Sequence, residues 1–390
     1  MLHSTDRILV THTGSLPRPR DLIEVMLAEN EGRAVAPAEY EDKLRSAVHD
    51  IVRRQKDLGV DIVDDGEFSK RGFAVYAHQR LDGLTGTGRV RVSPWDNSRE
   101  SQAFPEFYAG TNTIPGNTPN PSNMQMACTG PITYKAQERL AADLENLKAA
   151  ASAAEAVEAF VPAISPCDVA GNVENEYYKS DEEFLFAIAD ALRVEYLAIV
   201  DAGFLLQIDD PRLINYYVKS PELSVAQCRA WAEEQIEGIN HALRDIPEDR
   251  VRYHTCYGIN MGPRVHDMEM KDYIDIVLKI RAGAVSFEAS NPRHEHEWTI
   301  WEDVKLPDGK LIIPGVITQS SVVVEHPELI AQRLERFAGV VGRENVIAGS
   351  DCGFGTQALA VPEIHPDIVW AKFQAMSEGA RLASERLWGG

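Results

Sequence analysis

Short apolar runs alternate with longer segments of helical spacing along most of the chain, and no other feature constrains the fold as much. In residues 181–202, for example, Leu185, Ile188 and Leu192 recur at the spacing of one helix face. Strands that alternate with helices pair in parallel, and eight of them close into a barrel. The sequence therefore predicts an α/β fold, a (β/α)8 TIM barrel, whose eight strand candidates are residues 8–11, 60–64, 161–165, 205–208, 251–253, 284–287, 311–316 and 345–348.

Two alternatives compete with this assignment of the strands and of the fold. A ninth apolar run at 126–133 could take one of the eight places. A doubly wound open sheet is the structural rival, but no glycine fingerprint for a dinucleotide follows the first run. A barrel gathers its strand ends at one mouth, where such enzymes keep their chemistry, whereas an open sheet spreads them along a line. The polar or special residues that follow the runs are Gly14, Ser15, Gly66, Glu67, Asp209, Asp210, His254, Cys256, Glu288 and Cys352.

One segment interrupts the alternation. Residues 83–123, after the second strand candidate, are rich in Gly, Pro, Asn and Ser and contain one short alternating run at 89–92. A connection of this length is often a lid or an interface, and a surface hairpin without a catalytic role is the alternative. We expect a single domain over residues 1–390 with this loop or hairpin inserted in it.

The charge balance excludes some classes of protein. The 60 Asp and Glu against 39 Lys and Arg give a formal net charge of −21, which repels nucleic-acid phosphate. No apolar stretch of about 18 residues predicts a membrane span, and residues 1–6 carry no secretion signal. Five thinly spread cysteines favour reduced thiols in a cytoplasm over a disulfide framework. The sequence does not decide whether the chain forms a homo-oligomer.

Two thiols, an imidazole and a carboxylate at the ends of three runs form a candidate zinc ligand set: His254, Cys256, Glu288 and Cys352. Residues two apart on a strand point to the same face, so His254 and Cys256 can bind one ion together. Each residue alone is compatible with core packing or an ion pair. Cys128, Cys167 and Cys228 lack such partners and are interpreted as structural.

This ligand set favours chemistry on a thiol. A free thiol is mostly protonated at pH 7 and then a poor nucleophile, whereas a metal-bound thiol is deprotonated. Hydrolytic zinc sites more often carry nitrogen and carboxylate ligands. We therefore expect a small thiol as one substrate and rank hydrolysis behind it.

The chain resembles the catalytic C-terminal half of cobalamin-independent methionine synthase and its stand-alone relatives, including epoxyalkane:coenzyme M transferase. The resemblance covers almost the whole chain and rests on seven motifs in the family's order: Thr-Gly-Ser-Leu-Pro at 13–17, Asp-Gly-Glu-Phe at 65–68, Gly-Pro-Ile-Thr at 130–133, Gln-Ile-Asp-Asp-Pro at 207–211, His-Thr-Cys-Tyr at 254–257, Ser-Phe-Glu at 286–288 and Ser-Asp-Cys-Gly at 350–353. It implies a barrel with Zn²⁺ held by His254, Cys256 and Cys352. In the absence of the thiol, Glu288 or water would complete the set.

The resemblance also implies a pocket for an amino-acid thiol. Gly14 and Ser15 resemble the loop that receives the substrate carboxylate, and Glu67 and Asp209 resemble the acids that bind its ammonium group. Two carboxylates suit one cation on physical grounds as well. The alternatives are that Glu67 forms an ion pair at the barrel mouth and that Asp209 caps the following helix.

Three departures from the family pattern affect the prediction. The duplicated N-terminal half of full-length synthases has no counterpart in this chain. The family's Tyr-Asp-x-His-Ser reads Ile-Thr-Gln-Ser-Ser at 317–321, so the histidine that would serve as acid is missing. The segment 291–301 contains His294 and His296, which we consider as replacement acids. A polar surface loop is the alternative.

We therefore predict a cytoplasmic, zinc-dependent transferase that methylates or alkylates a small, homocysteine-like thiol with a small-molecule methyl or alkyl donor. The missing histidine predicts poor turnover with methyl-folate, because protonation of the leaving nitrogen is worth about 10²–10⁴-fold in rate. Thiol addition to an epoxide is one alternative. A barrel lyase of the uroporphyrinogen-decarboxylase kind, without catalytic zinc, and a non-catalytic binding protein are others.

Overall fold

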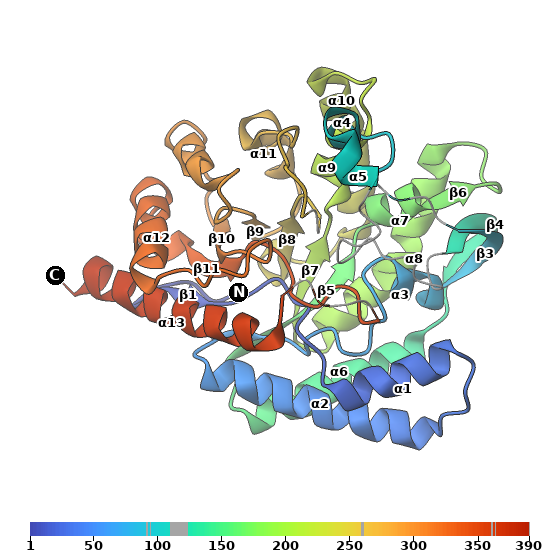
Figure 1. Cartoon of the computed structure of the whole chain (residues 1–390), viewed down its shortest axis with the longest axis horizontal. Helices are drawn as coiled ribbons and strands as arrows, with labels where there is room; N and C mark the ends of the chain where they lie inside the picture. Colours follow the sequence, from blue (N-terminus) through green and yellow to red (C-terminus); the bar gives the residue numbers. More distant parts are fainter. Residues whose placement is uncertain are drawn as a thin grey trace.

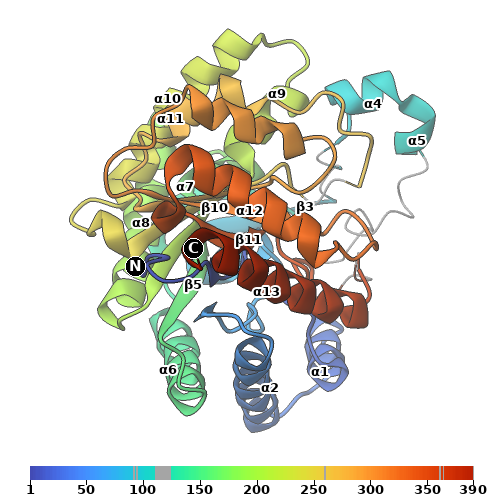
Figure 2. The same cartoon turned by 90° about the vertical axis from the view of Figure 1, so that its left-hand side faces the viewer.

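Eight parallel strands form a barrel in the computed structural model, which describes residues 1–90, 93, 95–109, 124–258, 261–359, 362 and 364–389. The strands neighbour one another in chain order, and the first pairs with the last. The remaining seam is bridged where the backbone N–H of Asp61 donates to the carbonyl of Val10 at 2.9 Å. The predicted (β/α)8 barrel is confirmed (Figures 1 and 2). Its strands are β1 (Leu9–Val10), β2 (Ile62–Val63), β5 (Glu158–Ile164), β7 (Leu205–Asp209), β8 (Val251–Thr255), β9 (Ala284–Phe287), β10 (Leu311–Ile317) and β11 (Ile347–Ser350).

Helices connect successive strands and cover the outside of the barrel (Figure 1). Side-chain caps define several of their starts: Ser180 accepts from the N–H of Glu183, and Ser224 forms a capping box with Gln227. The main helices are α1 (Arg20–Asn30), α2 (Pro37–Asp57), α6 (Gln137–Ala153), α7 (Pro166–Asn172), α8 (Asp181–Asp201), α9 (Arg212–Lys219), α10 (Val225–Ala242), α11 (Ile274–Val277), α12 (Pro327–Val341) and α13 (Pro366–Trp388). Short 3-10 segments, η3 (Met270–Asp272) and η4 (Glu295–Glu302), flank β9. Among the described residues, no helix is both long and apolar enough to cross a membrane.

The residues at the starts of the strands form an apolar cluster, against which Met1 packs. Further along the strands, the buried Arg252 lies over the Phe160 ring and donates to Thr11 and to the carbonyl of His12. The barrel thus changes from apolar at the amino ends of its strands to polar near their carboxyl ends, so that chemistry is confined to one mouth. The apolar cluster consists of Leu9, Ile62, Phe160, Leu205, Ala284, Leu311, Ile313 and Ile347.

The ninth apolar run belongs to a separate sheet outside the barrel. It is β4 (Met124–Tyr134), which pairs antiparallel with β3 (Leu81–Val90) and parallel with β6 (Val173–Asn175). The strand β3 begins two residues before the predicted insertion. Two short helices, α4 (Arg99–Ala103) and α5 (Pro105–Ala109), lie between β3 and β4 in the chain. Residues 91–92, 94 and 110–123 of the predicted insertion lie outside the described residues. The helix α4 packs next to α9, and Arg99 donates to the carbonyl of Tyr217 (Figure 1).

Candidate metal centre and substrate cavity

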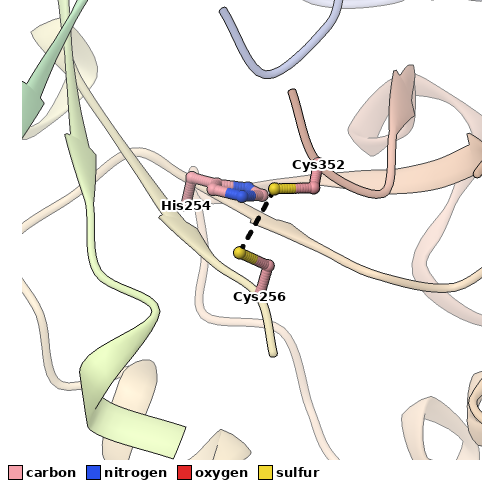
Figure 3. Close-up of side chains that lie close together, drawn as sticks. All are labelled: His254, Cys256 and Cys352. Carbon is pink, nitrogen blue, oxygen red and sulfur yellow. Dashed lines mark hydrogen bonds between the residues drawn. The ribbon is translucent and has the colours of Figure 1, made fainter. Parts of the chain in front are cut away.

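Three of the predicted zinc ligands converge at the barrel mouth. His254 and Cys256 lie on one face at the end of β8, and Cys352 follows β11. Their ligand atoms all lie within 4.8 Å of one another, and the two sulfurs are 3.5 Å apart. Figure 3 shows the imidazole and both thiols pointing toward one another. The barrel brings together residues almost a hundred positions apart in the sequence, as the convergence of strand ends predicts.

The electrostatics of the three side chains suit a soft cation. Burial lowers the pKa of His254 to about 3, so the imidazole is neutral and able to donate a lone pair. The Nδ1 atom contacts Ser286 Oγ at 3.0 Å, while the buried Nε2 has no hydrogen-bond partner among the described residues. Contact with Cys352 and burial raise the pKa of Cys256 well above its usual value. A cation between the sulfurs would remove that penalty, and one nitrogen with two sulfurs is a donor set typical of zinc.

Glu288, the predicted fourth ligand, lies outside this group. Its Oε1 accepts from the backbone N–H of Tyr257 at 2.9 Å, and its Oε2 accepts from Arg264 at 2.8 Å and Asn291 at 2.9 Å. Glu288 thus supports the backbone immediately after Cys256. Whether it also binds metal stays a prediction.

A cavity extends from the three ligands across the mouth of the barrel. Two groups of residues line it: the first comes from the β1, β2 and β7 ends, and the second from the insertion, α7 and α9. The residues around it include Thr13, Ser15, Glu67, Phe73, Trp95, Asp168, Asn172, Asp209, Asn215, Lys219, Gly258, Gly353, Thr356 and Gln357.

Glu67 and Asp209 belong to the first of these groups. Burial and the neighbouring Glu67 carboxylate raise the pKa of Asp209 well above its usual value, although Lys70 opposes this effect. Lys70 lies 3.6 Å from Glu67. Two carboxylates therefore line this part of the cavity, and together they could bind one ammonium group. Glu67 adopts a left-handed backbone with φ 58°, a strained conformation that is common where a side chain is aimed at a functional site.

Gly14 and Ser15 lie beside these acids. A Cβ atom on Gly14 would approach Glu67 Oε1 to 2.9 Å and Pro162 Cγ to 2.6 Å, so only glycine fits there. The Ser15 hydroxyl contacts the Thr356 hydroxyl at 3.2 Å. Three of the four predicted substrate residues therefore line the same cavity as three of the four predicted ligands, and the fourth, Gly14, lies next to Glu67.

Sequence reasoning missed the other end of the cavity. The Asn215 side chain is fully buried, and neither of its amide atoms has a hydrogen-bond partner among the described residues. Trp95 of the insertion and Lys219 of α9 lie beside it, with the ammonium 5.3 Å from the centroid of the indole ring. An unsatisfied buried amide is costly, and a ligand edge with a donor and an acceptor would satisfy it. The position of Asn215, six residues after Asp209 on the following helix, was the only sequence signal.

The two predicted acids do not line this cavity. His294 is buried, stacks on Tyr257 with ring centroids 4.1 Å apart, and contacts Asp267 at 3.2 Å and Glu297 at 2.9 Å. His296 is exposed on η4. Both residues come from the segment expected to carry an acid. Burial of the apolar side of this segment turns His294 inward, against Tyr257, and leaves His296 on the surface. Neither position supports proton transfer to a ligand in the cavity.

His294 is instead expected to make stability depend on pH. Burial alone would lower its pKa, but hydrogen bonds to Asp267 and Glu297 raise it to about 9. The folded pKa exceeds the unfolded value of about 6.5, so this contribution of roughly 3 kcal/mol is complete below about pH 6.5 and is lost as pH rises through about 9. Urea unfolding at pH 6 and 9.5 should show this loss in the wild type and not in His294→Gln. An equal loss in both proteins would contradict the assignment.

The model of the catalytic domain of cobalamin-independent synthases matches residues 8–167 and 169–364, which is most of the chain. The chain belongs to this family. Its relatives include the methionine synthase of Thermococcus kodakarensis, 25% identical over 343 residues, which are 87% of this chain and 84% of that protein. The methionine synthase of Sulfurisphaera tokodaii is 23% identical over 380 residues, 97% of this chain and 93% of that protein.

A longer protein and a solved structure are also similar to this chain. The 5-methyltetrahydropteroyltriglutamate–homocysteine methyltransferase of Thermotoga petrophila is 23% identical over 89% of this chain, which matches only 41% of that protein. A B12-independent methionine synthase structure from Shewanella sp. W3-18-1, in complex with selenomethionine, superposes with a TM-score of 0.73 at 17% identity and covers 98% of this chain and 100% of that one. At this identity the likeness shows the fold. The predicted resemblance to the cobalamin-independent synthase family is confirmed.

Proposed function

We propose that this member of the cobalamin-independent synthase family transfers a methyl or other alkyl group to the sulfur of a homocysteine-like amino thiol, with zinc held by His254, Cys256 and Cys352. The juxtaposition of these three ligands with an acidic pocket in one cavity carries the proposal. Bound zinc would supply thiol activation, because it keeps a sulfur deprotonated at neutral pH.

The residues at the acidic end would orient the amino thiol. Glu67 and Asp209 would bind its ammonium group, because both carboxylates line the cavity. The loop at Gly14 and Ser15 would receive the carboxylate, since no side chain at position 14 blocks the approach. The sulfur of a thiol held in this way is directed toward the cysteine pair, which lines the same cavity.

The opposite end of the cavity would bind the alkyl donor. Asn215 offers one donor group and one acceptor atom, and Trp95 offers an aromatic face. A donor placed there would contact residues other than Glu67 and Asp209. In this arrangement the two substrates share one cavity without sharing residues.

Donors that need little proton transfer fit this cavity best. Of the described residues around it, His254 is the only imidazole, and it belongs to the ligand group. The tertiary nitrogen of a donor such as methyl-folate is a slow leaving group unless an acid protonates it. Alkylation by an epoxide or by a cationic methyl donor therefore remains a second candidate, favoured by the positions of His294 and His296 away from the cavity.

One experiment tests the proposed function. The purified protein, loaded with zinc, is incubated with homocysteine and in turn with methyl-folate, a methyl sulfonium compound and a short epoxide, and the thioether product is measured by mass spectrometry. We expect S-alkylation that chelation abolishes and zinc restores, with the sulfonium or epoxide faster than methyl-folate. Protein that retains no zinc and forms no thioether with any donor would refute the proposal.

A further inference from the structure

A second cavity lies outside the barrel, among the helices α7, α8, α9 and α10, which pack against one another (Figure 1). Its volume of about 910 Å³ is within the range of sites that hold small molecules. None of the described residues that line it also lines the cavity at the barrel mouth, although α7 and α9 contribute side chains to both. The alkyl transfer proposed above therefore makes no use of this second cavity.

Arg212, the first residue of α9, brings a positive charge to the wall of the second cavity. Its Nε atom is buried and has no hydrogen-bond partner among the described residues, and none of their carboxylates lies within ion-pair distance of the guanidinium. Two other arginines, Arg80 and Arg333, each form an ion pair with a carboxylate. A buried donor without a partner costs free energy, and the planar N–H groups of a guanidinium match a carboxylate. The unpaired Arg212 therefore indicates a site for an anionic group.

The neighbours of Arg212 hold its guanidinium in the wall of the cavity. A Cβ atom at Gly171 of α7 would lie 1.8 Å from the Cζ and Nε atoms of Arg212, so a side chain there would displace the guanidinium. The rings of Tyr216 and Trp231 stack with centroids 3.7 Å apart, and each centroid lies 5.9 Å from Arg212 Cζ. These rings attract a cation but offer no acceptor to its N–H groups. The guanidinium is thus positioned without being satisfied.

The other residues around the cavity limit which anion fits. Val173, Phe184 and Leu185 are buried and form an apolar part of the wall, which suits a ligand with a hydrocarbon or aromatic body. Acids repel a phosphate or any other ligand with several negative charges, and they attract an ammonium group. A zwitterion with one carboxylate, one ammonium group and an apolar side chain therefore fits best. The acids that line the cavity, all of them exposed, are Asp181, Glu182, Glu234 and Glu237.

We propose that this cavity is a second binding site, and that it takes an amino acid with an apolar side chain. The carboxylate of the amino acid pairs with Arg212, and its ammonium group is attracted by the acids. Its side chain packs against Trp231 and the apolar part of the wall. The site needs neither zinc nor any residue of the barrel mouth, so the proposal stands independently of the proposed function.

Calorimetric titration of the purified chain with L-phenylalanine tests the proposal, because this amino acid combines both charges with an aromatic side chain. We expect a Kd below about 1 mM, weaker binding of 3-phenylpropionate, which lacks the ammonium group, and no binding of phenethylamine, which lacks the carboxylate. Arg212→Met removes the charge but keeps an unbranched side chain, and it should weaken the binding of phenylalanine by about 10–100-fold. Binding should also change the tryptophan fluorescence of the wild type but not that of Trp231→Phe.

Matched variants separate this site from the rest of the molecule. Arg229→Met changes an arginine of α10 that is paired with Asp275 and does not line the cavity, so the affinity should not change. Glu67→Gln, in the mouth cavity, should also leave it unchanged. If Arg212→Met does not fold, Gly171→Ala takes its place, because the added methyl group displaces the guanidinium without removing it.

Three results would overturn the proposal: no binding of phenylalanine by the wild type, unchanged affinity when the guanidinium is removed or displaced, or binding of 3-phenylpropionate as tight as that of phenylalanine. The proposed function is tested separately. A chain that binds phenylalanine through Arg212 but forms no thioether would refute the proposed function and leave the second site in place.

Discussion

Replacement of Cys352 by serine should strip the protein of most of its zinc while leaving the barrel folded. The substitution removes one of only two sulfur ligands, and an alcohol is not deprotonated at neutral pH as a metal-bound thiol is. Loss of a group that merely supports a ligand typically costs about 10–100-fold in metal affinity, and loss of the ligand itself should cost more. Elemental analysis after dialysis should fall from about one zinc per chain to a small fraction.

The control for this experiment is Cys228→Ser. Cys228 is as buried as Cys352 but lies on α10, outside the ligand group. Its replacement should change stability without changing zinc content. Circular dichroism would confirm that both variants remain folded, because the apolar core does not include the metal. Full zinc occupancy in Cys352→Ser would show that the metal, if present, binds elsewhere.

Replacement of Glu67 by glutamine should weaken the use of homocysteine selectively. The carboxylate is buried, and Lys70 lies 3.6 Å away, so the variant removes a negative charge that faces both the Lys70 ammonium and the ammonium group of the substrate. Removing one partner of a buried charge pair costs about 2–5 kcal/mol, which is a loss of roughly 10²-fold or more in kcat/KM. The thiol 4-mercaptobutyrate, which lacks the amino group, should be used equally well by the variant and the wild type.

Zinc content and a surface variant separate this effect from general damage. Glu67→Gln should retain full zinc, since Glu67 is not among the ligands. Glu233→Gln, which breaks an exposed pair with Lys279, should leave both thiols unaffected. A loss of equal size for homocysteine and 4-mercaptobutyrate would mean that Glu67 does not recognise the ammonium group.

The barrel could be predicted because its physical basis is local. Parallel strands covered by helices are buried on both faces, so they appear in the sequence as continuous apolar runs, as in residues 311–316. The convergence of His254, Cys256 and Cys352 followed from the closure of eight such strands. The ninth run had the same composition as a barrel strand, and only its antiparallel partner in the insertion assigns it to a separate sheet.

The partners of individual side chains could not be predicted in the same way. Arg264 lies in a segment without periodicity, and nothing in its neighbours indicates that it meets Glu288 across the mouth. His294 was a reasonable acid by residue type, but its direction depends on the two buried carboxylates that it contacts. Asn215 was overlooked because a single amide on a helix carries no pattern. Residue type identifies chemistry, whereas the tertiary contacts decide where that chemistry is available.

The two ends of the cavity belong to different kinds of structure. Residues that follow the strands of the barrel form the part proposed to bind the amino thiol, while the insertion contributes Trp95 to the same cavity. The first set is tied to the core of the fold, so a change there risks the whole molecule. A connection between two strands tolerates replacement far better. Descendants of this chain could therefore acquire a new alkylating partner by exchanging one loop, provided that the new loop keeps a buried acid in the place of Glu100, which accepts from the backbone N–H groups of Arg264 and His266.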